Sequence, residues 1–250
     1  MEVHAHTHTA RKKWTHYFWE FLMLFLAVFC GFIAENLREK HIEHLRAKEF
    51  AETLLRDIKK DTTSLSLIIK ELDFVVPKID TFRNLVKDRE INDLPGGTWY
   101  YYARFTTRYF DFSPQDATIE QLKNSGSLRY FKNHVLETAI AQYYQNWRDL
   151  KTRDQYIISI NEKILEFRNK IFNSFYFDSL MDLKISREKV DFFMKQPIDL
   201  LNTNKKYMIE MSNYCQVEVF HFNRRKTEYQ TILNAGNNVL ILLKKEYPLE

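Results

Sequence analysis

The sequence predicts an all-α protein: a single N-terminal transmembrane helix that continues into an antiparallel bundle of long helices. The 250 residues include only five glycines and five prolines, whereas average usage would give about three times as many. Few turn-forming residues imply few turns, which suits long helices better than strands. Apolar residues also recur at spacings of three, four and seven over long stretches, which is the pattern of a helix with one buried face.

The first expected element is a transmembrane helix over residues 14–35. Residues 21–34 carry no charge, and Tyr17, Phe18 and Trp19 extend the apolar stretch to residues 17–34, interrupted only by Glu20. At 1.5 Å per residue this stretch spans about 27 Å, close to the ~30 Å of a bilayer core. The residues expected to contact lipid are Trp14, Tyr17, Trp19, Phe21, Leu22, Leu24, Phe25, Leu26, Phe29, Phe32 and Ile33.

A cleaved signal peptide or the core helix of a soluble protein would also produce an apolar segment of this kind. A signal peptide needs a small-x-small cleavage site after its apolar core, and "CGFIAENLREK" has no clear site of this kind. The helical pattern also continues through that sequence. We therefore expect a retained, single-pass anchor.

The orientation of the anchor follows less directly, because basic residues lie on both sides of it. Residues 11–13 are basic before the span, and Arg38, Lys40, Arg46 and Lys48 follow it. A long domain can be translocated largely regardless of its charge. We expect the inner (cytoplasmic) membrane, with the N-terminus in the cytoplasm and the large domain in the periplasm.

Residues 1–13 form a tail with alternating His4, His6 and His8. Neutral imidazoles bind divalent metals, but this tail has no apolar pattern that would order it. We expect a disordered basic tail and no metal site.

The helical bundle is expected over residues 36–250, with long helices at about 36–76, 134–175 and 204–246. Pro77 is the first helix breaker after the span, and "LPGG" at residues 94–97 predicts a turn. Thr118 and Gln121 fit a capping box, Gly126 fits a left-handed helix end, and Asn133 is a candidate cap. Packing of these helices against one another is favoured over a long isolated coiled coil.

Eight aromatic residues gather in "TWYYYARFTTRYFDFSP", residues 98–114. They can fill the core of the bundle or form the wall of a ligand pocket. Arg104 and Arg108 lie four residues apart, so they can bind an anion together or pair with Asp111 and Asp116. The candidate ligand-binding residues are Trp99, Tyr101, Arg104 and Arg108.

Three stretches carry a resemblance to a known family. They are "KKWTHYFWEFLMLFLAVFCGFIAEN" before "LLRDIKKDT", "TIEQLKNSGSLRYFKN", and "LLKKEYPLE" at the C-terminal end. They resemble a group of single-span membrane proteins common in Bacteroidota, a domain of unknown function. The resemblance implies a membrane anchor, and it implies no reaction and no functional residues.

The sequence contains none of the motifs that mark common enzymes. It lacks a phosphate-binding glycine loop, G-x-S-x-G, HExxH and CxxC, so we expect no catalytic residues, no metal and no cofactor. A net charge of +4 with interspersed acids and bases argues against nucleic-acid binding. We expect a non-enzymatic scaffold or interaction module whose partners are the lipid bilayer and either a second copy or another envelope protein. The alternative is a ligand-sensing bundle that acts through a separate protein.

Overall fold

The computed structural model describes residues 13–151, 154–180 and 185–248, and within these ranges every regular element is a helix. The expected all-α class is confirmed. The chain divides into two compact units, residues 1–50 and 51–250. The expected disordered tail over residues 1–13 falls almost wholly outside the described residues.

Helix α1 runs from Trp14 to Asp88 and crosses the boundary between the two units. The expected helix end near residue 76 is therefore wrong, because Pro77 lies inside α1. Pro77 and Asp73 are both on the exposed side of the helix, so the Asp73 carbonyl that loses its N–H donor can bond to water. Burial of Val75 and Ile79 on the opposite side holds the helix together on both sides of the proline.

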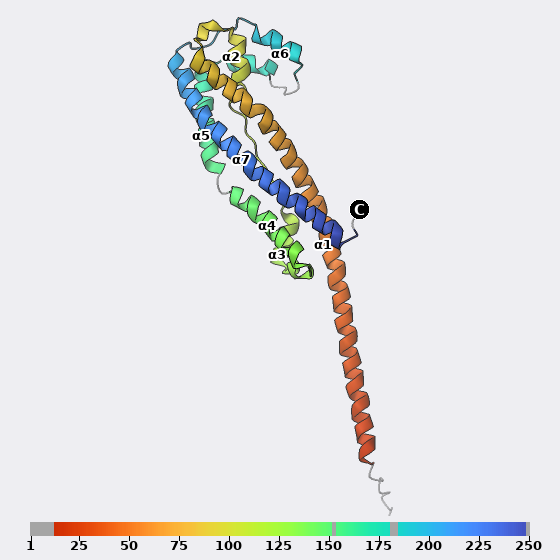
Figure 1. Ribbon diagram of the computed structural model, residues 1–250. Coiled ribbons are helices and arrows are strands. Elements are labelled where there is room, and N and C mark those ends of the chain that lie inside the picture. The colour runs from red at the N-terminus through yellow and green to blue at the C-terminus, as the bar shows by residue number, and fades with distance from the viewer. Residues whose placement is uncertain (1–12, 152–153, 181–184, 249–250) are drawn as a thin grey trace, which may run out of the picture. The chain divides into compact units, whose positions relative to one another are not determined.

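The second unit is built from residues 51–88 of α1 together with α4 (His134–Lys151), α5 (Asp154–Ile171) and α7 (Lys205–Glu246). Helix α7 packs against both α4 and α5 along its length (Figure 1). The core between them contains fully buried apolar side chains from each helix, among them Leu54, Ile58, Leu72, Ile140, Ile164, Met211 and Val239. The helix expected over residues 134–175 corresponds to α4 and α5, which lie on either side of residues 152–153 and end at Ile171.

At one end of this unit, α2 (Gly96–Ala103) packs against α6 (Arg187–Met194) (Figure 1). The expected turn at residues 94–97 is wrong in part, because Gly96 and Gly97 form the first turn of α2. A Cβ atom on Gly97 would lie 2.0 Å from the Phe193 carbonyl oxygen, so glycine is needed there for close backbone contact. The Gly97 N–H donates to the Gln196 carbonyl at 3.0 Å.

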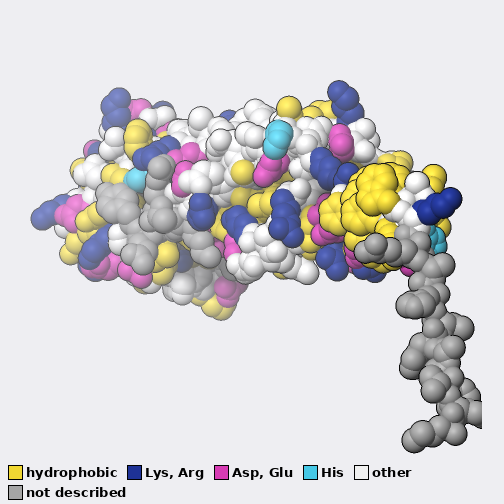
Figure 2. Space-filling view, turned by 90° about the horizontal axis from the view of Figure 1, so that it is seen from below, with side chains coloured by type: hydrophobic (Ala, Val, Ile, Leu, Met, Phe, Trp, Pro, Cys, Tyr) yellow, Lys and Arg dark blue, Asp and Glu magenta, His cyan; other side chains and the backbone are white. Residues whose placement is uncertain are grey.

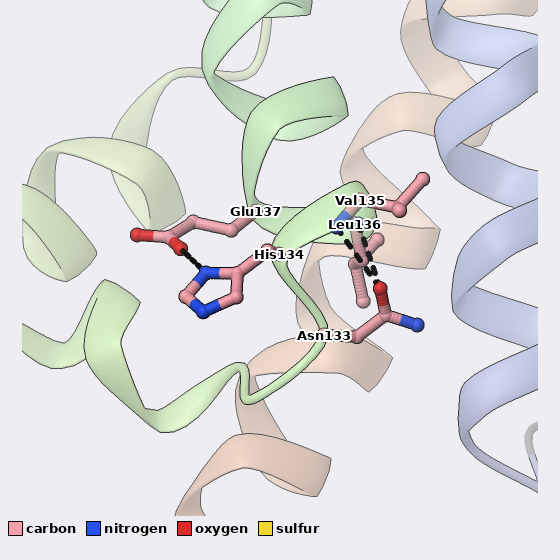
Figure 3. Close-up of polar contacts among 5 residues, drawn as sticks. All are labelled: Asn133, His134, Val135, Leu136 and Glu137. Atoms are coloured by element: carbon pink, nitrogen blue, oxygen red, sulfur yellow. Dashed lines mark hydrogen bonds and ion pairs between the residues drawn. The ribbon is translucent and has the colours of Figure 1, made fainter.

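The predicted cap of α4 is confirmed. The Asn133 side-chain oxygen accepts hydrogen bonds from the Val135 and Leu136 N–H groups at 3.0 and 3.3 Å, and His134 contacts Glu137 one turn along (Figure 3). The Asn133 side-chain amide also donates to Glu246 at 2.9 Å, which joins the start of α4 to the end of α7.

The expected capping box at Thr118 is wrong. Helix α3 runs from Ala117 to Asn124 with Asp116 at its N-cap position, and the Thr118 hydroxyl instead donates to Asp57 of α1. Gly126, which follows α3, has φ of 66°, as expected for a left-handed helix end. Three 3₁₀ helices complete the described elements: η1 (Ile91–Asp93), η2 (Ser127–Tyr130) and η3 (Ser174–Leu180).

Candidate functional site: an arginine-lined pocket

The aromatic residues singled out by the sequence belong to the core. Trp99 and Tyr101 of α2 are 1% and 6% exposed. The Trp99 indole N–H donates to the Ile91 carbonyl at 3.0 Å, and its ring packs edge-on against Phe82. Of the two roles considered for this segment, these two rings therefore take the structural one.

The two arginines have a different environment, because both line one pocket of about 360 Å³. Arg104 is the C-cap residue of α2, and Arg108 lies four residues further on, beyond the end of this helix. The remaining lining residues come from the same loop, from α5 and from η3, namely Thr107, Arg168, Ser174, Phe177, Asp178 and Leu180. All of these residues lie within the second compact unit.

Arg104 is held in place by contacts on several sides. Its Nη1 donates to the Leu180 carbonyl at 2.6 Å. Its guanidinium carbon lies 4.8 Å from the centre of the Tyr101 ring and 4.5 Å from that of Phe105. Cations over aromatic faces at these distances are attracted to the ring, so the core aromatics fix the position of this charge.

Arg168 approaches the pocket from the last turn of α5. Its Nη1 donates to the Thr107 hydroxyl oxygen, and its guanidinium lies 4.8 Å from the centre of the Phe177 ring. Burial lowers the pKa of Arg168 from its ordinary value, but arginine remains protonated in proteins. Its Nε is buried and has no hydrogen-bond partner among the described residues.

Positive charge is in excess among the described lining residues. Three are arginines, and Asp178 is the one carboxylate. Within the described ranges neither Arg108 nor Asp178 forms an ion pair, so the expected alternative of pairing between Arg108 and Asp111 or Asp116 is not seen. Guanidinium groups bind carboxylates and phosphates through paired hydrogen bonds, and this is the chemistry that the pocket offers.

Sequence reasoning identified Arg104 and Arg108 but missed Arg168 and the η3 residues. Arg168 lies sixty residues beyond Arg108, and a basic residue in the last turn of a helix is usually explained by the helix dipole. In the sequence, Arg168 lies between two apolar residues, Phe167 and Ile171, and both are buried in the structure. This position was the available signal that Arg168 does not lie on a fully solvated face.

The predicted anchor is a second functional feature, in the first compact unit. Helix α1 contains an 18-residue window that is long and apolar enough to cross a membrane, and none of that window is buried. Of the predicted lipid-contacting residues, only Leu22 is half-buried and the others are exposed. Figure 2 shows hydrophobic side chains gathered at this end of α1, and Phe21, Phe25 and Phe29 stack along it at 5.9–6.3 Å between ring centres.

Metal binding has no support in the part of the chain that the structure describes, where no group of three or more His, Cys, Asp or Glu side chains could hold an ion. His4, His6 and His8 lie outside the described residues.

Comparisons of the chain with protein-family models, with curated proteins and with solved structures give no match. The resemblance to single-span proteins of Bacteroidota therefore stays a prediction.

Proposed function

We propose that this protein is a single-pass, membrane-anchored helical module that acts by binding and not by catalysis. The observation that carries this proposal is the apolar window of α1, none of which is buried in the fold. Exposing this many large apolar side chains to water is unfavourable by about 25 cal/mol per Å², and a bilayer would remove that cost. A signal sequence has the same composition, but the helix continues without interruption through residues 35–50.

We place the anchor in the inner membrane with the helical domain in the periplasm. Support for this orientation comes from the basic residues 11–13, which lie close to the span on its short side, and from the ability of long domains to be translocated whatever their charge. In this compartment the domain would associate with a second copy or with another envelope protein.

Membrane extraction tests the anchor. The protein is expected to stay in the pellet after alkaline carbonate and to be released by detergent. Leu26→Arg, near the centre of the apolar segment, places a charge where insertion costs about 3 kcal/mol, so it should move the protein into the carbonate-soluble fraction. The matched control is Leu37→Arg, because Leu37 is also exposed but lies beyond the segment. Release of the wild-type protein by carbonate, or an intact mass that shows cleavage within residues 30–40, would refute the anchor.

Reporter fusions test the orientation separately. A C-terminal alkaline phosphatase fusion should be active and a cytoplasm-dependent fluorescent fusion inactive. The opposite pattern would place the helical domain in the cytoplasm and leave the anchor unchanged.

A second function, ligand sensing through a separate partner protein, is favoured by the arginine-lined pocket. Its volume of about 360 Å³ is at the lower end of the range for small-molecule sites. Ligand occupancy could then alter how the module binds its partner.

A further inference from the structure

We propose that the arginine-lined pocket binds a small phosphorylated molecule through its phosphoryl group. This inference rests on the ligand-binding function proposed above and adds the chemical class of the ligand. It depends on three properties of the pocket: its charge, the fixed position of its donors, and its size.

The charge of the pocket matches a phosphate monoester. Arg104, Arg108 and Arg168 contribute three positive charges and Asp178 one negative charge. The described lining residues thus carry a net charge of +2 (three minus one). A phosphate monoester carries about −1.5 to −2 at pH 7, so its charge is opposite in sign and similar in size to the net charge of these lining residues.

The donors are positioned before any ligand arrives. Arg104 is fixed by the Leu180 carbonyl and by two aromatic rings, and Arg168 is fixed by Thr107 and Phe177. Because the Thr107 hydroxyl oxygen accepts from Arg168, its own proton is left to donate to a ligand oxygen. Binding would therefore cost little side-chain ordering for these groups.

Arg108 is the adjustable member of the set. It is half-buried, and its side chain forms no hydrogen bond or ion pair within the described ranges. Its guanidinium can swing onto the phosphoryl oxygens and supply the paired hydrogen bonds for which arginine is suited. Since this side chain has no polar partner to lose among the described residues, Arg108 is the best position for a test.

The size and apolar side of the pocket limit the rest of the ligand. Phe177 and Leu180 contribute apolar surface, and the volume of about 360 Å³ leaves room for only a small organic group beyond the phosphate. We expect a compact phosphate ester, either free in solution or forming the headgroup of an anionic lipid.

Isothermal titration calorimetry on the full chain in detergent tests this inference. The probes are glycerol 3-phosphate, inorganic phosphate, glycerol and succinate. Glycerol 3-phosphate is expected to bind, and glycerol is not. Affinity should rise as pH increases through about 6, where the phosphate gains its second charge.

Three variants decide whether the pocket is responsible. Arg108→Gln and Arg168→Gln should each weaken binding about tenfold or more, as expected for loss of a charge-assisted hydrogen bond. The control Arg129→Gln removes the same charge from an exposed arginine outside the pocket and should leave affinity within about twofold. Arg168→Gln also removes the bond to Thr107, so the thermal midpoint of each variant is measured alongside. Arg108→Gln, which breaks no side-chain hydrogen bond or ion pair among the described residues, carries the decision.

Reconstitution into vesicles distinguishes the two sources of the phosphoryl group. Because the anchor would retain the protein on any vesicle, the full chain is reconstituted into phosphatidylcholine vesicles with and without phosphatidic acid and titrated with glycerol 3-phosphate. A weaker apparent affinity for glycerol 3-phosphate in the vesicles with phosphatidic acid identifies a competing lipid headgroup, and equal affinity in both identifies a free ester.

Two results would overturn the inference in different ways. If succinate binds as tightly as glycerol 3-phosphate and needs Arg108, the pocket is a ligand site but not one for phosphoryl groups. If no probe binds at millimolar concentration in either format, the ligand-binding function itself is refuted. Neither result affects the anchor, which membrane extraction measures independently.

Discussion

Gly236 of α7 lies against Thr62 of α1 so closely that a Cβ atom on the glycine would come within 2.8 Å of the Thr62 methyl carbon. The same atom would lie 3.1 Å from the Tyr143 ring of α4. Three helices thus meet at one position where only a hydrogen atom fits. Helix α7 continues through this glycine without interruption, although glycine lowers helix stability by about 1 kcal/mol relative to alanine.

Gly236→Ala should therefore lower the free energy of unfolding by about 1–3 kcal/mol, because overpacking outweighs the gain in helix propensity. Thr62→Ser removes the obstructing methyl group, so it should recover part of the loss when combined with Gly236→Ala. Chemical denaturation of the four proteins of this cycle in detergent measures the coupling. An additive cycle would show that the methyl contact is not the cause.

Glu218 of α7 is a buried carboxyl group with one hydrogen-bond partner among the described residues. It is 1% exposed, its Oε1 accepts from the Asn161 side chain at 3.2 Å, and its Oε2 has no hydrogen-bond partner among the described residues. Burial raises the pKa of Glu218 well above its ordinary value, and the Asn161 bond opposes this shift only in part. At pH values between the ordinary glutamate pKa and the raised pKa of the folded state, the folded protein therefore holds a proton that the unfolded chain releases.

Glu218→Gln should raise stability at neutral pH by about 1–3 kcal/mol, because an amide is neutral and folding then carries no cost of protonating or burying a charged carboxylate. A group whose pKa is raised by folding stabilises the fold at low pH, and this contribution is lost as pH rises from the ordinary glutamate pKa through the folded value. The difference between variant and wild type should accordingly be small at pH 4 and grow toward pH 7. Denaturation curves at several pH values measure it, and a difference that shrinks with pH would contradict the assignment.

Asn133 has two separable roles at the start of α4. Asn133→Ala should lower the free energy of unfolding by about 0.5–2 kcal/mol through loss of the cap. The substitution also removes the hydrogen bond to Glu246, which adds to this loss. Asn133→Ser keeps a capping oxygen but cannot reach Glu246, so its stability should fall between wild type and the alanine variant. Thermal unfolding of the three proteins checks the order; equal losses for serine and alanine would assign the whole effect to Glu246.

Local signals in the sequence predicted the helix ends that depend on local chemistry. Asn133 and Gly126 were identified because a cap and a left-handed helix end each need only a few adjacent residues. The helix end predicted from Pro77 and the turn predicted from the glycines at 96–97 were wrong for the opposite reason. Their outcome depends on tertiary contacts: buried neighbours sustain α1 through Pro77, and α6 approaches the first turn of α2. Spacing alone contains neither fact.

For the same reason, only part of the candidate site could be predicted from the sequence. Arg104 and Arg108 are four residues apart, so their proximity follows from the sequence, although α2 ends at Ala103 and they do not share a helix face. Arg168 joins them only because the C-terminal end of α5 reaches the loop after α2. Likewise, the sequence could not decide between core and pocket for Trp99 and Tyr101, since aromatic rings suit both. In the structure these rings are core, and Tyr101 contributes to the site by lying beneath Arg104.

A buried polar network joins α1, α4 and the segment before α3. Asp61 is 2% exposed, and its two carboxyl oxygens accept from the Tyr143 hydroxyl at 2.8 Å and from the Gln115 N–H at 2.9 Å. Burial raises the pKa of Asp61, while these two hydrogen bonds lower it. The neighbouring Tyr144 hydroxyl is also buried, but it has no hydrogen-bond partner among the described residues.

Adjacent tyrosines thus provide a matched pair for a final prediction. Tyr143→Phe removes a donor from a buried carboxylate, so it should cost about 1.5–3 kcal/mol at neutral pH. Tyr144→Phe removes a hydroxyl group that is desolvated without a partner, so it should be neutral or stabilising. Removing the Tyr143 bond also raises the pKa of Asp61 further. The stability contribution of a raised carboxyl pKa is present at low pH and lost as pH rises, so the Tyr143→Phe deficit should shrink on acidification. Denaturant titrations at pH 4 and pH 7 test this, and equal effects of the two substitutions would show that Asp61 does not depend on Tyr143.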